Sequence, residues 1–199
     1  MLIFRSALAA SLLSLACNAS AGLSDVPSGQ YGLDNSHGYI TFSYSHLGFS
    51  NPHVGFKSFT VDLNLDSESP EKSTVNVTID ATSIDSRVDN FNGHLNGPNF
   101  FDTANHPTIT FTSTAIEVTG EDTMNVQGDL TIKGISKPVT LMTTINKAGN
   151  HPMRKTPWLG VEAETKVSRS DWGLTRAVPN VGDEVTIWIS VELPKSQSE

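Results

Sequence analysis

Apolar residues recur at every second position through most of this 199-residue chain. In one segment Ile40, Phe42 and Tyr44 alternate with Thr41 and Ser43. Successive side chains of a β-strand point to opposite faces, so a period of two gives a strand one apolar and one polar face. The pattern predicts at least eight strands, over residues 40–44, 61–65, 75–79, 109–112, 126–132, 139–145, 161–167 and 185–191.

Short turn sequences such as SESPEK and VPNVGDE separate these segments. No long helical period lies between them, which excludes parallel β-α-β units and favours an antiparallel meander. Closing such a meander into a barrel removes its exposed edges. We therefore predict an all-β fold, an antiparallel β-barrel of about eight strands with its apolar faces inward. Such an interior can be filled by side chains or can hold one small ligand, and the sequence leaves both open.

The alternation stops in residues 87–107, which read RVDNFNGHLNGPNFFDTANHP. Val88, Phe91 and Leu95 fall at i, i+3 and i+7, the spacing of one helical face. Gly97-Pro98 would end this helix, because proline cannot continue it. A short helix between two strands of a barrel lies across an open end, so we predict a helical lid.

Two local signals frame the lid. Asp85 or Ser86 can cap the N-terminus of its helix, since both side chains accept hydrogen bonds from free backbone N–H groups. Asn99-Phe100-Phe101-Asp102 predicts a further turn before His106-Pro107 returns to strand. The lid either gates an apolar interior or seals a solid core.

The N-terminus has the three parts of a secretory signal peptide. Arg5 precedes a run of small and apolar residues that is short for a membrane span, and Ala19-Ser20-Ala21 supplies a small-residue cleavage site. We predict a signal peptide over residues 1–21, cleavage after Ala21 and export to the periplasm. The alternative is a lipoprotein box ending at Cys17, with that cysteine acylated.

Cleavage there would leave a linker over 22–29, one domain over 30–193 and a frayed tail over 194–199. The chain has 21 acidic and 13 basic residues and a net charge of −8 at pH 7. An acidic surface argues against nucleic acid and anionic membrane faces as partners. No transmembrane segment is predicted.

The reactive side chains do not form a known catalytic or metal-binding motif. The chain has six histidines, yet no H-x-x-x-H, H-x-H or C-x-x-C pair that would indicate a zinc site. There is no G-x-S-x-G motif, and the single cysteine lies in the predicted signal peptide. We expect no metal, no cofactor and no enzymatic activity. The alternative is an enzyme that acts on an amphipathic substrate with His94 as acid/base.

Several motifs coincide in order and spacing. Residues 128–139 read GDLTIKGISKPV, the lid contains His94-Leu95 and Phe100-Phe101, and residues 169–173 read RSDWG. Over residues 30–192 the chain resembles the YceI-like family of exported bacterial proteins. That resemblance implies a lipocalin-like antiparallel barrel, an elongated apolar cavity and polyisoprenoid-type lipids as ligand class. It also implies a periplasmic or secreted location and no established catalytic activity.

The lid departs from the family pattern. Members often show Arg-Asp-x-His-Leu where this chain has Phe91-Asn92-Gly93-His94-Leu95, and the family's Asp-Phe-Phe-like turn reads Asn99-Phe100-Phe101 here. Two carboxylates have become amides and an arginine has become phenylalanine. A charge network carried by those groups in relatives is therefore not expected in this chain.

An apolar barrel with a few polar groups at its mouth suits an amphipathic ligand, with the tail inside and the head at the rim. We predict a periplasmic protein that binds an isoprenoid, a quinone-like molecule or another long-chain lipid, with His94, Asn92, Arg87 or Asn99 at the head group. The predicted ligand-binding residues are Phe42, Tyr44, Val77, Ile79, Phe91, His94, Phe100, Phe101, Phe111, Leu130 and Ile187. A ligand-free stress or interaction protein with a solid barrel is a further alternative. The oligomeric state, a dimer included, is left open.

Overall fold

The computed structural model describes residues 22–197. The predicted signal peptide, its cleavage after Ala21 and the alternative acylation of Cys17 lie outside the described residues, as do residues 198 and 199. Among the helices of the described part, none has the length and apolar character needed to cross a membrane.

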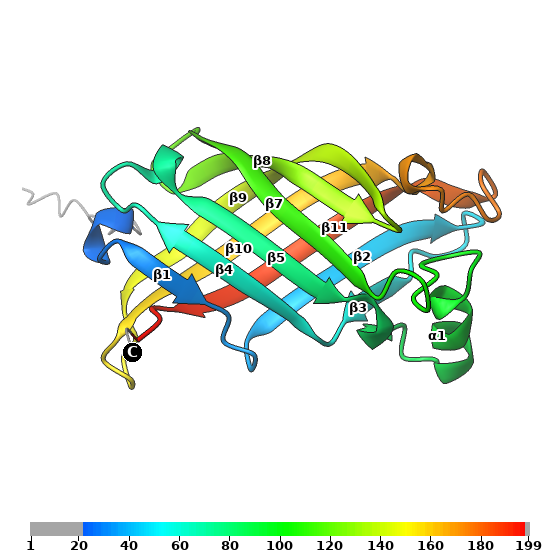
Figure 1. Ribbon diagram of the computed structural model, residues 1–199, viewed down its shortest axis with the longest axis horizontal. Helices are drawn as coiled ribbons and strands as arrows, with labels where there is room; N and C mark the ends of the chain where they lie inside the picture. The colour runs from blue at the N-terminus through cyan, green and yellow to red at the C-terminus, as the bar shows by residue number, and fades with distance from the viewer. Residues whose placement is uncertain (1–21, 198–199) are drawn as a thin grey trace, which may run out of the picture.

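Within residues 22–197, eleven antiparallel strands form one curled sheet around an elongated interior (Figure 1). The hydrogen-bonded order is β1-β4-β5-β7-β8-β9-β10-β11-β2-β3-β6, so most neighbours in the sheet are also neighbours in the sequence. This confirms the predicted all-β, antiparallel arrangement. The strands are β1 (Gly29–Gly32), β2 (Gly38–His46), β3 (His53–Phe56), β4 (Phe59–Leu65), β5 (Thr74–Asp80), β6 (Ile84–Asp85), β7 (Thr108–Val118), β8 (Thr123–Ile132), β9 (Ile135–Asn150), β10 (Pro157–Ser168) and β11 (Val181–Pro194).

The predicted number of about eight strands is wrong. The eight predicted segments form the longer strands, while β1, β3 and β6 are additional strands of only 4, 4 and 2 residues. Strands this short carry too few positions to show an alternating pattern. Because β1 and β6 are the two edges of the hydrogen-bonded order, the sheet is barrel-like rather than a fully closed barrel.

The lid forms a short helix, α1 (Asp89–Asn96), at one end of the sheet (Figure 1). The predicted cap at Asp85 or Ser86 is wrong, because the helix begins after Val88. The Ser86 hydroxyl instead donates its shorter hydrogen bond to Oδ1 of Asn92, at 2.6 Å. Gly97 ends the helix and residues 98–101 form a turn, as predicted. Four 3-10 helices complete the elements of the described chain: η1 (Leu23–Asp25), η2 (Pro70–Lys72), η3 (Ala81–Ser83) and η4 (Arg169–Trp172).

The N-terminal part of the described chain packs against the end of the sheet opposite α1 (Figure 1). Val26 is 3% exposed and Tyr31 is 1% exposed, and the Tyr31 hydroxyl donates to the Pro27 carbonyl at 2.7 Å. Residues 22–29 were predicted as a linker. They are part of the packed domain, because the Val26 side chain is buried in the hydrophobic core.

The C-terminal residues are also paired with the sheet. The Lys195 N–H donates to the Pro157 carbonyl at 2.9 Å, and the Ser196 N–H donates to the Gln30 carbonyl at 2.8 Å. The tail predicted to fray from residue 194 is thus ordered by hydrogen bonds as far as Ser196.

The packing of the interior changes along its length. At the end opposite α1, Leu159 and Leu193 face each other on β10 and β11 and are 1% and 3% exposed. Toward α1, Phe42 and Ile187 on β2 and β11 also point inward but are only half-buried. The interior is therefore filled at one end and incompletely filled beneath the lid.

Candidate ligand-binding cavity

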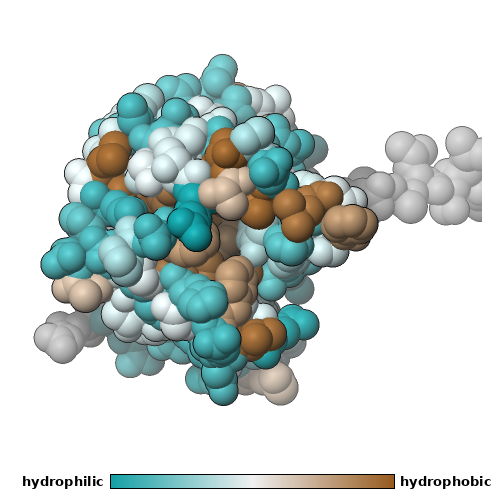
Figure 2. All heavy atoms as spheres, turned by 90° about the vertical axis from the view of Figure 1, so that its right-hand side faces the viewer, coloured by the Kyte–Doolittle hydropathy of each residue, from teal (hydrophilic) through white to brown (hydrophobic). Residues whose placement is uncertain are grey.

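A cavity of about 300 Å³ lies inside the curled sheet, beneath α1. Its wall is formed by β2, β3, β5, β7, β8, β9, β10, β11 and η4, and α1 with the following turn covers it. His46, Arg176 and Ala177 on its wall are exposed, so the cavity reaches the surface. Figure 2 shows this end of the molecule, where hydrophobic residues lie in a hollow framed by hydrophilic ones.

Nearly all of the residues predicted to bind a ligand lie on this cavity. Those on strands occupy the inward face, as the period of two predicted, whereas Phe91 lies on α1 and Phe100 and Phe101 lie in the turn after it. Half-buried apolar side chains that point inward need open space beside them, which counts against a solid barrel. The predicted residues on the wall are Phe42, Tyr44, Val77, Ile79, Phe91, Phe100, Phe101, Phe111, Leu130 and Ile187.

Three aromatic rings hold the lid against the sheet. The centroid of the Phe101 ring lies 6.1 Å from that of Phe42 and 5.8 Å from that of Phe56, the latter edge-on. Phe42 and Phe56 are 6.0 Å apart, so the three rings form one cluster. Farther along the rim, the Lys133 amino group donates to the Pro98 carbonyl at 3.2 Å. The lid is therefore attached both by packing and by a polar contact to the β8–β9 turn.

Gly128 shapes the wall by allowing Phe111 to lie close to β8. A Cβ atom on residue 128 would be 2.4 Å from Cζ of Phe111 and 2.5 Å from the carbonyl oxygen of Thr112. Both distances are far inside van der Waals contact. This inward-facing glycine therefore serves close packing of an aromatic wall residue rather than open space.

The polar residues predicted at the head group do not lie on the cavity wall. His94 is exposed on α1, whereas Phe91 and Leu95 of the same helix line the cavity. The helix turns its apolar face inward and its polar residues toward water. The enzymatic alternative, which needs His94 beside a substrate in the interior, therefore has no support from its position. The other predicted head-group residues are also absent from the wall: Asn92, Arg87 and Asn99.

Arg169, the first residue of η4, is one of the polar residues of the wall, and no role was predicted for it from the sequence. Partial burial lowers the pKa of its guanidinium, but an arginine remains charged in proteins. Each of its hydrogen bonds goes to a backbone carbonyl of the segment around residues 174–182, so Arg169 fixes this segment at the mouth. Nε donates to Gly182 at 2.9 Å, Nη2 to Arg176 at 2.9 Å and Val181 at 3.0 Å, and Nη1 to Leu174.

Two further polar interactions lie close to Arg169, one between Ser170 and Asp183 and one with Tyr44. The Ser170 hydroxyl donates to Asp183 at 2.7 Å, which is the largest cause of the lowered pKa of that carboxyl; the Arg169 charge adds to the effect. Burial raises the pKa of Tyr44 on the wall, so its phenol stays a neutral O–H donor. A sequence signal existed, because Arg169 and Ser170 open the RSDWG motif, but motif membership alone did not reveal the loop that Arg169 holds.

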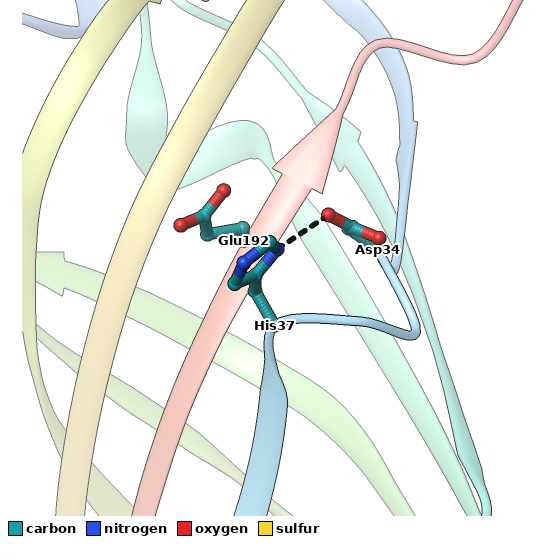
Figure 3. Close-up of side chains that lie close together, drawn as sticks. All are labelled: Asp34, His37 and Glu192. Atoms are coloured by element: carbon teal, nitrogen blue, oxygen red, sulfur yellow. Dashed lines mark hydrogen bonds and ion pairs between the residues drawn. The ribbon is translucent and has the colours of Figure 1, made fainter.

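Among the described residues, Asp34, His37 and Glu192 form the group that could offer ligands to a metal ion (Figure 3). Their ligand atoms lie within 4.8 Å of one another, outside the cavity. Their side chains already form hydrogen bonds within the group and with a neighbouring residue. His37 Nδ1 is 2.9 Å from Asp34 Oδ2, and the Trp158 indole N–H donates to Glu192 at 2.9 Å. The backbone N–H of Asp34 donates to the Glu192 carbonyl at 2.9 Å, so the group ties the β1–β2 loop to β11.

Comparison with known proteins finds similarity over almost the whole described chain. The model of the YceI-like domain matches residues 31–193. A UPF0312 protein of Azotobacter vinelandii is 32% identical over 88% of this chain and 92% of its own length. The crystal structure of Burkholderia cenocepacia BcnA has a TM-score of 0.73 at 24% identity, covering 80% of this chain and 98% of that one. A polyisoprenoid binding domain from Saccharophagus degradans, implicated in plant cell wall breakdown, has a TM-score of 0.64 at 15% identity, covering 85% of this chain and 100% of that one. The chain therefore belongs to the YceI-like family.

Proposed function

We propose that this protein binds the apolar tail of a long-chain amphipathic lipid, such as an isoprenoid or a quinone-like molecule, in the cavity beneath α1. The observation that carries the proposal is the wall itself, where inward-facing apolar residues surround about 300 Å³ of space. Burying a tail there contributes about 25 cal/mol per Å² of apolar surface removed from water. The Saccharophagus degradans domain, described as polyisoprenoid binding, shares the fold and supports this ligand class.

We infer a binding role rather than an enzymatic one. His94, the acid/base group of the enzymatic alternative, lies outside the cavity. His46 is on the wall, but among the described residues that line the cavity there is no carboxylate to orient its imidazole or to act as a general acid or base itself.

The periplasm is the proposed location. The N-terminal sequence through Ala21 supports it, together with the resemblance to exported proteins. Fractionation of cells that express the full chain tests this: the protein is expected in the periplasm at a mass that lacks residues 1–21. Retention of the full-length chain in the cytoplasm would contradict it.

A cavity-filling substitution tests the binding proposal. Ile187 is half-buried on the wall, so Ile187→Trp is expected to occupy the space that a tail needs. Thr186→Trp places the same ring on the opposite face of β11 and is the matched control. Calorimetric titration with geranylgeraniol should show saturable binding to the wild type and to Thr186→Trp, and binding weakened at least about tenfold in Ile187→Trp. A wild type that binds no long-chain lipid would refute the proposal.

A further inference from the structure

The charged residues on the cavity wall carry only one sign. The chain has 21 acidic and 13 basic residues, so acids outnumber bases overall. Among the described residues that line the cavity, however, Arg169 and Arg176 are present, His46 adds a third basic side chain, and there is no Asp or Glu. Arg169 donates to backbone carbonyls, whereas the side chains of Arg176 and His46 are exposed at the cavity, so their N–H donors can meet a polar group of a ligand.

These basic residues gather at the mouth. His46 ends β2 and pairs in register with Val181, the first residue of β11. Arg176 lies in the loop just before β11, and the Arg169 guanidinium donates to the carbonyls of both Arg176 and Val181, at 2.9 and 3.0 Å. One end of the cavity therefore holds the basic groups, and most of the remaining wall is apolar.

Arg169 and Arg176 are not equivalent. Arg169 directs its donors to four backbone carbonyls and has little capacity left for a ligand. Arg176 is exposed at the mouth, and its guanidinium has no hydrogen bond or ion pair with any described residue. Arg169 therefore holds the loop before β11 in place, and the side chain of Arg176 in that loop is exposed.

We propose that the ligand has an oxyanionic head group, a carboxylate or a phosphate, that Arg176 binds at the cavity mouth with an imidazole N–H of His46 as a second donor. This inference rests on the proposed function, because the tail must occupy the cavity for the head to lie at the mouth. The planar guanidinium matches an oxyanion with two parallel hydrogen bonds. Arg169 is a positioning residue, which holds the loop and adds positive charge beneath the head.

Ligands with the same tail and different heads test the proposal. Hexadecanoic acid, hexadecyl phosphate and hexadecanol are titrated into the wild type, Arg176→Gln and Arg87→Gln. Arg87 is an exposed arginine off the wall and is the matched control. The wild type and Arg87→Gln should bind both anions about tenfold or more tighter than the alcohol, the worth of a charge-assisted hydrogen bond. Arg176→Gln should lose this preference and bind the alcohol within about twofold of the wild type, since the tail contacts are unchanged.

The outcomes separate the head-group proposal from the proposed function. Alcohol binding without any preference for the two anions would overturn the oxyanion site and leave the apolar cavity as the binding site. An anion preference that survives in Arg176→Gln would also overturn it. Failure of all three ligands to bind the wild type would overturn both. A preference for one anion only would support the site and identify the head group.

Discussion

The ring of Phe101, in the turn after α1, lies 6.1 Å from the ring of Phe42 on β2. Phe101 is 8% exposed, whereas Phe42 is half-buried and faces the cavity. Phe101 thus anchors the lid, and Phe42 faces the interior of the cavity. The lid is fixed to the wall through the same aromatic cluster that bounds the proposed tail site.

Phe101→Ala should destabilise the protein by about 3–5 kcal/mol, because it removes a buried ring and leaves a void between lid and sheet. Urea unfolding gives the free energy of unfolding. Phe49→Ala is the control, since Phe49 is 89% exposed and its loss should change stability by less than about 0.5 kcal/mol. Equal effects of the two substitutions would show that Phe101 does not anchor the lid.

Gly128→Ala should lower the free energy of unfolding by about 1–3 kcal/mol, the usual cost of overpacking. The added methyl group would collide with Phe111 and with the backbone of Thr112, as both lie within 2.5 Å of its position. Gly93→Ala is a matched comparison, because nothing lies within 4 Å of a Cβ there and residue 93 is helical. That variant should gain up to about 1 kcal/mol. A tolerated alanine at 128 would contradict the close approach of Phe111.

The contact between His37 and Asp34 predicts a pH-dependent contribution to stability. The hydrogen bond with Asp34 raises the pKa of His37, so its contribution is present below the unfolded-state value near 6.5 and is lost as pH rises through the folded-state value. The pKa of Asp34 is lowered to about 2, mainly by His37, so its contribution is present above 3.8 and is lost as pH falls toward 2. Wild type and Asp34→Asn should therefore differ more in urea midpoint at pH 5 than at pH 8. The same difference at both pH values would count against this ion pair.

Affinity should depend steeply on tail length. Each methylene group transferred from water to the apolar wall contributes about 0.8 kcal/mol, or about a fourfold decrease in Kd. A series of linear alcohols should show this increment until the cavity is filled, after which Kd should level off. In Ile187→Trp the levelling should occur at a shorter chain. A flat series from the shortest alcohol onward would indicate binding outside the cavity.

The sequence predicted the wall of the cavity well because the wall follows a local rule. Alternation along each strand decides which side chains face inward, and this placed Phe42, Phe111 and Ile187 on the cavity without knowledge of any distant contact. The short strands β1, β3 and β6 were missed because four residues or fewer do not display a period. Their positions depend on pairing with strands far away in the sequence.

The polar mouth could not be predicted in the same way. His46 and Arg176 share one end of the cavity because β2 pairs with β11, and Arg169 reaches the loop between them across a turn of the chain. The pairing of β2 with β11 joins residues that are far apart in sequence, and the Arg169 hydrogen bonds depend on the fold of the loop after η4. His94 was predicted at the head group because it lies among the polar residues of the lid. The helix instead turns Phe91 and Leu95 inward and leaves His94 exposed to water. Polarity within a segment did not reveal which face of the segment meets the cavity.

Native mass spectrometry of the protein purified from its own cells tests the central claim most directly. The wild type and Thr186→Trp are expected to carry a lipid-sized mass excess that solvent extraction removes, and Ile187→Trp is expected to lack it. A wild type with the mass of the polypeptide alone, or a mass excess of the same size in Ile187→Trp, would contradict a lipid tail in this cavity.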